Sequence, residues 1–194
     1  LRKKYLAGEA LTQEELEGLL HKALVERIFV PVFAGSCVKE EGVISFMDNV
    51  VDYFPTMADF GRIPLVNGEQ LDISPDDDRP VVFVFKSLQD PSNGRLSFLK
   101  VLAGTVTPGL ELVCARTRKT ERLTHLFRMM GKETQEVKAA SAGDIIVVPK
   151  LEAQTGDTLS VTGKVEAAAF RFPNSLYRIA IEPDKRGTED KLYT

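Results

Sequence analysis

The sequence predicts an α/β segment followed by an all-β domain, either a β-barrel or a β-sandwich. From Pro80 to Cys114, short runs rich in Val and Phe alternate with Pro, Asn and Gly at intervals of about ten residues. This pattern is typical of consecutive antiparallel strands, and it continues to about Glu182. Residues 11–54 instead show apolar residues at helical spacing on both sides of one continuous apolar run.

The all-β part contains a series of short expected strands. Asn93-Gly94 and Pro108-Gly109 supply the positive φ angles that tight turns between the first of them require. The expected strands are 80–86, 96–102, 110–114, 123–127, 145–148, 158–161 and 177–181.

The N-terminal part predicts a helix, a strand and a second helix. Thr12 and Glu15 match a capping box, and an apolar stripe at helical spacing follows them. The apolar run 28–34 suits a strand covered on both faces, and a second helical stripe over 43–54 ends before Pro55. Because one strand cannot make a sheet, we expect this unit to be the end of a larger α/β domain or to pack on something outside the chain.

Residues 56–79 change character, since Gly, Pro and Asn-Gly pairs break any periodicity there. We therefore expect a linker between two domains, in which only Ile63–Val66 could form a short edge strand. The expected boundaries are 1–58 for the α/β part, 59–79 for the linker, 80–183 for the β domain and 184–194 for a junction to a further domain.

Charge is distributed unevenly along a chain whose formal net charge is −3. Between Arg116 and Lys132, six basic residues stand against one acid. Two interpretations remain open: a site for RNA phosphates on the loops of a barrel, or a solvated hairpin whose cations only cover the surface.

Cys37 and Cys114 form neither a disulfide framework nor a zinc spacing, which favours a reduced, cytosolic protein. No apolar run reaches the roughly 18 residues of a membrane span.

Catalytic patterns are nearly absent from the sequence. Its two histidines, His21 and His125, lie in an expected helix and an expected strand, and nothing near either cysteine activates a thiolate. Gly35-Ser36 follows the expected strand 28–34, a position where Gly and Ser allow a ligand to approach the backbone closely. An ordinary strand-to-loop turn is the other interpretation.

Ordered motifs across both parts of the chain carry a resemblance to a known family. The motifs are Val30–Cys37, Lys39, Gly42-Val43, Asp48–Pro55, Asp90-Pro91, Gly94–Phe98, Val101–Gly109, Ala142-Gly143-Asp144, Thr155–Leu159 and Ile181–Pro183. Together they resemble translation elongation factor G and its close bacterial relatives over essentially the whole chain. The first group is similar to the end of that family's GTPase domain, and the others are similar to its second domain.

The resemblance implies a closed antiparallel β-barrel behind the end of a GTPase domain. It also implies a ribosome-associated GTPase that acts in translocation or ribosome recycling, with the barrel against RNA of the small ribosomal subunit. The residues implied at the guanine edge of GTP are Gly35, Ser36, Cys37 and Val38. The RNA-binding candidates in the basic stretch are Arg116, Arg118, Lys119 and Arg122.

Two departures from the family pattern indicate a diverged paralogue. Cys37 stands where the guanine motif usually has Ala, and Arg128-Met-Met-Gly-Lys132 replaces the common His-Ala-Asn-Lys. The sequence also has no phosphate loop and no Asn-Lys-x-Asp motif. We therefore expect a fragment that alone neither hydrolyses nor binds GTP, whereas the intact parent would use GTP or GDP with Mg²⁺.

Other functional classes remain as alternatives. A free-standing RNA- or oligosaccharide-binding barrel without enzymatic activity is the main one, and a small enzyme that uses Cys or Ser lacks an obvious base. We expect no catalytic residue and no metal ligand in this chain, a monomeric state, and no membrane partner.

Overall fold

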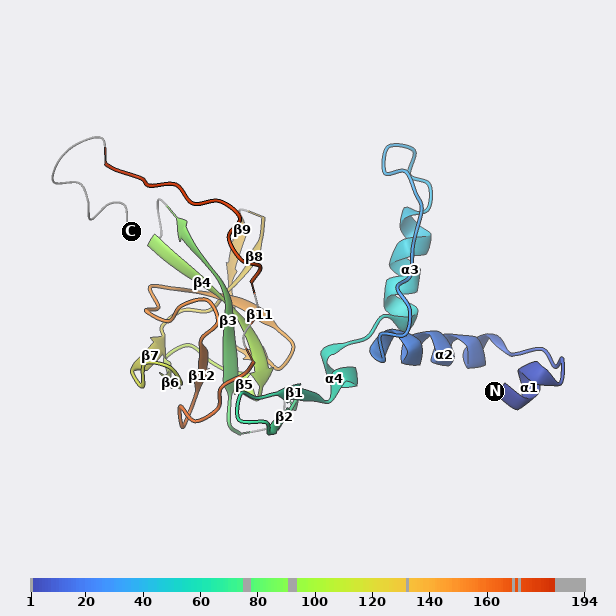
Figure 1. The fold of residues 1–194 in the computed structure, drawn as a ribbon, viewed down its shortest axis with the longest axis horizontal. Helices are drawn as coiled ribbons and strands as arrows, with labels where there is room; N and C mark the ends of the chain where they lie inside the picture. Colours follow the sequence, from blue (N-terminus) through green and yellow to red (C-terminus); the bar gives the residue numbers. More distant parts are fainter. Residues whose placement is uncertain are drawn as a thin grey trace. The chain divides into compact units, whose positions relative to one another are not determined.

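The computed structural model describes residues 2–74, 78–90, 94–131, 133–168, 170 and 172–183. The chain divides into two units, Leu1–Gly61 and Arg62–Thr194, each of which is described by itself (Figure 1). None of the described helices is long and apolar enough to cross a membrane.

The first unit is helical. Its elements are α1 (Arg2–Leu6), α2 (Gln13–Val25), α3 (Val43–Tyr53) and α4 (Met57–Phe60). The Thr12 side chain accepts from Glu15 N–H and the Glu15 carboxylate accepts from Thr12 N–H, so the expected capping box begins α2. His21 connects the helices, since its two ring nitrogens lie 3.1 Å from the Tyr53 carbonyl oxygen and 3.1 Å from an Asp59 carboxylate oxygen.

The strand expected over 28–34 is not formed. The described residues provide no neighbouring strand for this segment, and Val30 and Val32 are 84% and 91% exposed. A β-strand needs hydrogen-bonding partners on at least one side, so the sequence alone could not secure one here. The first ladder contact is the isolated bridge between Ser36 and Glu41.

The second unit is built on strands. They are β1 (Arg62–Pro64), β2 (Gln70–Asp72), β3 (Val81–Asp90), β4 (Gly94–Ala103), β5 (Thr105–Val106), β6 (Leu110–Cys114), β7 (Thr120–Leu123), β8 (Phe127–Met130), β9 (Glu133–Glu136), β10 (Ala140–Ser141), β11 (Ile145–Pro149) and β12 (Thr158–Ser160). Eight of them form one antiparallel sheet in the order β7-β6-β12-β3-β4-β11-β8-β9 (Figure 1). The pairs β1–β2 and β5–β10 form separate two-stranded ribbons.

The expected closed barrel is a curled half-barrel instead. Within the described residues, β7 and β9 are the two edges of the sheet and do not pair with each other. Shifts of register in the β3–β4 pair, at Val81/Val82 and Val84/Lys86, mark irregularities of the kind that bend and twist strands. The sheet therefore curves around its core without closing.

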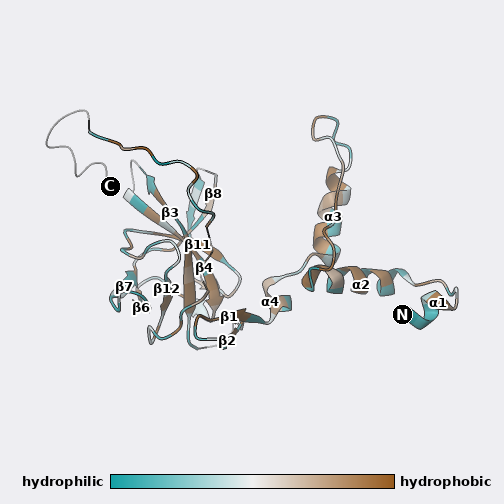
Figure 2. Cartoon of the chain, in the orientation of Figure 1, coloured by the Kyte–Doolittle hydropathy of each residue, from teal (hydrophilic) through white to brown (hydrophobic). Residues whose placement is uncertain are grey.

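The core lies on the concave face of this sheet. Alternate residues of each strand point to opposite faces, and one face is apolar and fully buried. The largest buried side chains include Leu99, Leu112, Leu123, Leu126, Ile146 and Leu159. Figure 2 shows the corresponding hydrophobic colour along β3 and β4. Burial of this apolar face is the main contribution to the stability of the second unit.

Several boundaries differ from the sequence prediction. Only the ends of the expected strand 123–127 lie in strands, since β7 ends at Leu123 and β8 begins at Phe127. Residues 177–181 form no strand in the described part of the chain. The stretch 59–79, expected as a linker with a possible edge strand at Ile63–Val66, contains β1 over Arg62–Pro64 and also β2, and Leu65 bridges to Ala167. The expected junction 184–194 lies outside the described residues.

Candidate functional site

The loop that begins at Gly35 is a tight turn held by backbone hydrogen bonds. Ser36 N–H donates to Glu41 O at 3.0 Å, and Glu41 N–H donates to Ser36 O at 3.1 Å. The Ser36 hydroxyl accepts from Lys39 N–H at 3.3 Å. Glu40 and Gly42 both have left-handed backbone angles, with φ of 57° and 76°.

Two glycines allow this loop to close. A Cβ atom on Gly35 would lie 2.8 Å from the Glu41 carbonyl oxygen, and one on Gly42 would lie 2.9 Å from the Ala34 carbonyl oxygen. Both distances are too short for any other residue without movement of the backbone. The close approach of the two sides of the loop therefore explains why the predicted guanine motif has a glycine at position 35.

Beside this loop is a hollow of about 290 Å³ lined by residues 33–37, 42, 43 and 46. Phe33 and Phe46 meet edge to face there, with ring centroids 5.1 Å apart. Within the described residues, the N–H groups of Cys37 and Val38 donate no hydrogen bond, and both residues are exposed. The loop thus presents the Cys37 amide beside the hollow and the Val38 amide next along the chain, a combination that suits a flat polar ring.

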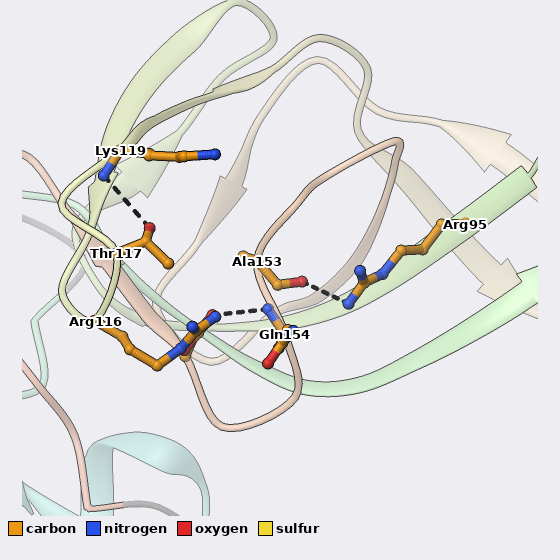
Figure 3. A network of polar contacts seen from close by, with 7 residues as sticks. Arg95, Arg116, Thr117, Lys119, Ala153 and Gln154 are labelled. Carbon is orange, nitrogen blue, oxygen red and sulfur yellow. Dashed lines mark hydrogen bonds and ion pairs between the residues drawn. The ribbon is translucent and has the colours of Figure 1, made fainter. Parts of the chain in front are cut away.

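The basic residues after β6 are not equivalent, and Arg116 is the most constrained. Its guanidinium donates to both carboxylate oxygens of Asp157, at 2.6 and 2.8 Å. Asp157 also accepts from Gln154 N–H at 2.7 Å, and its side chain is 5% exposed. Figure 3 shows Arg116 directed toward the Gln154 turn. This geometry assigns Arg116 to holding two loops of the half-barrel together.

Burial by itself raises the pKa of the Asp157 carboxyl. The hydrogen bonds from Arg116 and from Gln154 N–H outweigh burial and hold the pKa of Asp157 below its ordinary value. The carboxylate is therefore charged at neutral pH, and the Arg116–Asp157 pair is ionic and bidentate.

The other three RNA-binding candidates are exposed, as Arg116 itself is, but none of them makes a bidentate ion pair. Arg118 Nη1 donates to the Gly163 carbonyl oxygen at 2.6 Å, and Lys119 Nζ lies 2.9 Å from a Glu152 carboxylate oxygen. The side chain of Arg122, on β7, makes no hydrogen bond or ion pair with any residue that the structure describes. The structure therefore brings the four candidates to one end of the sheet. Of the four, Arg122 alone has a side chain without a hydrogen-bond or ion-pair partner among the described residues.

Lys150 is a residue that sequence reasoning missed. It follows β11 in a left-handed turn, with φ of 61°, and it lines the same hollow of about 540 Å³ as Arg122. Its ammonium has no partner among the described residues. A single Lys after a strand is not a sequence pattern that predicts a binding site. Lys150 and Arg122 line the same hollow only in the folded sheet.

The described residues contain no group of three or more His, Cys, Asp or Glu side chains placed to hold a metal ion. The two candidate regions are thus a loop with amide donors and a basic end of a β-sheet. Neither geometry contains a nucleophile with an adjacent base.

Residues 80–162 match the family model described as elongation factor G domain 2. These residues belong to the elongation factor G domain 2 family. The resemblance of the chain to the elongation factor G family is thereby confirmed.

A protein from Thermus thermophilus of known crystal structure is similar over more than this domain. It shares 30% sequence identity with a TM-score of 0.72, and the match covers 98% of the present chain. The chain spans 27% of the length of the Thermus protein. The basic residues and Lys150 lie inside the elongation factor G domain 2, whereas the Gly35 loop lies before it.

Proposed function

We propose that the chain is part of a ribosome-associated translational GTPase of the elongation factor G family, in which domain 2 contacts RNA of the small ribosomal subunit. The match of residues 80–162 to elongation factor G domain 2 is the observation that carries this proposal. The similarity to the Thermus protein on both sides of that domain supports it. The parent would act in translocation or in ribosome recycling.

The RNA contact is assigned to the exposed cations at the β7 end of the sheet. Arg118, Lys119 and Arg122 are exposed there, in a chain whose formal net charge is negative. Cations gathered at one end of an otherwise acidic protein direct that end toward phosphates. Arg116 contributes indirectly, because its pair with Asp157 fixes the loop on which Arg118 and Lys119 lie.

The Gly35 loop is assigned to the guanine edge of GTP in the intact parent. The hydroxyl of Ser36 and the amides of Cys37 and Val38 would meet the base, with GTP or GDP and Mg²⁺ held mainly by parts that this sequence lacks. Exposed apolar residues in the first unit, among them Val32 and Val51 at 91% and 81% exposure, support its packing against a further surface. A free-standing barrel would have no use for such a surface.

The salt dependence of ribosome binding tests the proposal. We expect the chain with Arg118→Ala, Lys119→Ala and Arg122→Ala to bind small ribosomal subunits more weakly, with a log–log salt slope shallower by about 2. Arg116 stays unchanged so that the fold is kept. Co-sedimentation over a range of KCl concentrations is the measurement.

Lys164→Ala is the matched control, since Lys164 is exposed in the same unit and its side chain has no partner among the described residues. It should leave the slope unchanged. A triple variant with the wild-type slope would show that these cations meet no phosphate and would remove the RNA contact from the proposal.

A further inference from the structure

A groove of about 840 Å³ runs along the face of the sheet opposite the core. Its floor includes Val147, which lies between the core residues Ile146 and Val148 and therefore points to the other face. Val147 is paired with Phe127 across the β11–β8 ladder. The hairpin β8–β9 forms one wall of the groove, and the β3–β4 hairpin forms another.

An aromatic stack lies in this groove. The rings of His125 and Phe127 are nearly parallel, with centroids 6.1 Å apart and an interplanar angle of 23°. The His125 Nδ1–H donates to a Glu136 carboxylate oxygen at 2.8 Å, which fixes the orientation of the ring. The His125 side chain is 59% exposed, so its ring is accessible to a further planar group.

The groove adjoins the basic hollow through a shared residue. Lys150 lines both the groove and the hollow that contains Arg122. Both cations are exposed and without an ion-pair partner in the described part of the chain. An accessible aromatic ring beside unpaired cations offers stacking for a base and charge for its phosphate.

We propose that this groove binds one unpaired nucleotide of RNA, with its base stacked on His125 and its phosphate beside Lys150. The inference rests on the RNA contact of the proposed function and names the kind of RNA that this face accepts. A base inside a duplex keeps its stacking neighbours and cannot enter the groove, whereas a looped or bulged base can. Glu136 and Thr134, at the same wall, can bond to the polar edge of the base.

Two probes of equal phosphate number test this inference on the full chain: a single-stranded oligoadenylate carrying one 2-aminopurine, and a blunt RNA duplex. Quenching of the 2-aminopurine emission reports stacking, and titration gives the affinity. We expect His125→Ala to weaken binding of the single strand at least about fivefold and to leave duplex binding unchanged. His125→Phe, which keeps an aromatic ring, should restore most of the affinity.

The cation is tested by Lys150→Asn, because Asn tolerates the left-handed conformation while removing the charge. The salt slope for the single strand should become shallower by about 0.7, and Lys164→Asn should not change it.

Equal loss of affinity in His125→Ala and His125→Phe would overturn the inference, because it would assign the effect to the Glu136 bond and not to stacking. Duplex binding without any preference for the single strand would overturn it as well, while the proposed RNA contact would stand. Failure of the single strand to bind would overturn this inference alone, because co-sedimentation with small ribosomal subunits tests the RNA contact of the proposed function separately.

Discussion

Asp157→Ala is expected to lower the free energy of unfolding of the half-barrel by about 2 kcal/mol. Asp157 is nearly inaccessible and accepts hydrogen bonds from the guanidinium of Arg116 and from Gln154 N–H. Its removal leaves Gln154 N–H without its acceptor and releases the half-exposed guanidinium of Arg116 from the loop that it holds. Urea unfolding of the full chain, followed by circular dichroism, measures the change.

Glu152→Ala is the matched control for this experiment. Glu152 also pairs with a cation of the same loop, Lys119, but both side chains are mostly exposed, at 72% and 67%. An exposed ion pair contributes little to stability, so the control should unfold like the wild type. Equal unfolding curves for Asp157→Ala and Glu152→Ala would contradict the structural role of the Arg116–Asp157 pair.

The same pair predicts a dependence of stability on pH. Because the pKa of Asp157 is lower in the folded chain than its ordinary value of 3.8, the stabilisation is fully present above that value. It is lost as pH falls through the folded pKa, which lies lower still. The difference in unfolding free energy between wild type and Asp157→Ala should therefore be constant near neutral pH and shrink below about pH 4.

Gly163→Ala is expected to destabilise the half-barrel by about 3 kcal/mol. Gly163 has a left-handed φ of 64°, and a Cβ atom there would lie 2.6 Å from a methyl carbon of Val113. Both backbone strain and overpacking follow. The turn also presents the carbonyl oxygen that accepts from Arg118, so ribosome binding should weaken together with stability.

Gly131→Ala separates the two causes. Gly131 has nearly the same φ, 62°, but a Cβ atom there would meet nothing within 4 Å. Only the backbone strain remains, and we expect a loss of about 1 kcal/mol in the same unfolding experiment. Equal losses at Gly163 and Gly131 would show that contact with Val113 adds nothing.

Local rules account for the parts of the fold that the sequence predicted. The Thr12–Glu15 capping box involves residues three positions apart, and it begins α2 as expected. The strands within 80–114 are bounded by turns whose Gly residues take positive φ, including Gly94 and Gly109. Such features depend on neighbouring residues alone, so a pattern in the sequence is enough to find them.

Features that depend on distant partners could not be predicted in this way. The apolar run 28–34 has the composition of a buried strand, but a strand forms only with neighbours, and the described chain offers none. The alternating residues 177–181 remain unpaired for the same reason. Closure of the sheet is also a long-range property, because it requires the edges β7 and β9 to meet.

The same distinction between local and long-range features applies to the residues of the candidate sites. Sequence reasoning placed the four basic residues 116, 118, 119 and 122 together, but it could not separate Arg116 from the rest, because its partner Asp157 lies far along the chain. It also missed Lys150 and the stacking face of His125, which are adjacent only in the folded sheet. The Gly35–Val38 loop was singled out from the Gly-Ser pair after the apolar run 28–34 and from the family resemblance, and its nucleotide role stays a prediction.

Chemical probing of ribosomal RNA tests most directly whether domain 2 contacts the small subunit. Small ribosomal subunits are modified with and without the full chain, and the reactivity of every nucleotide is compared. We expect protection confined to one region of the small-subunit RNA, lost at high salt and lost with the Arg118, Lys119 and Arg122 triple variant. Unchanged reactivity at chain concentrations that saturate co-sedimentation, or protection that survives in the triple variant, would contradict the account.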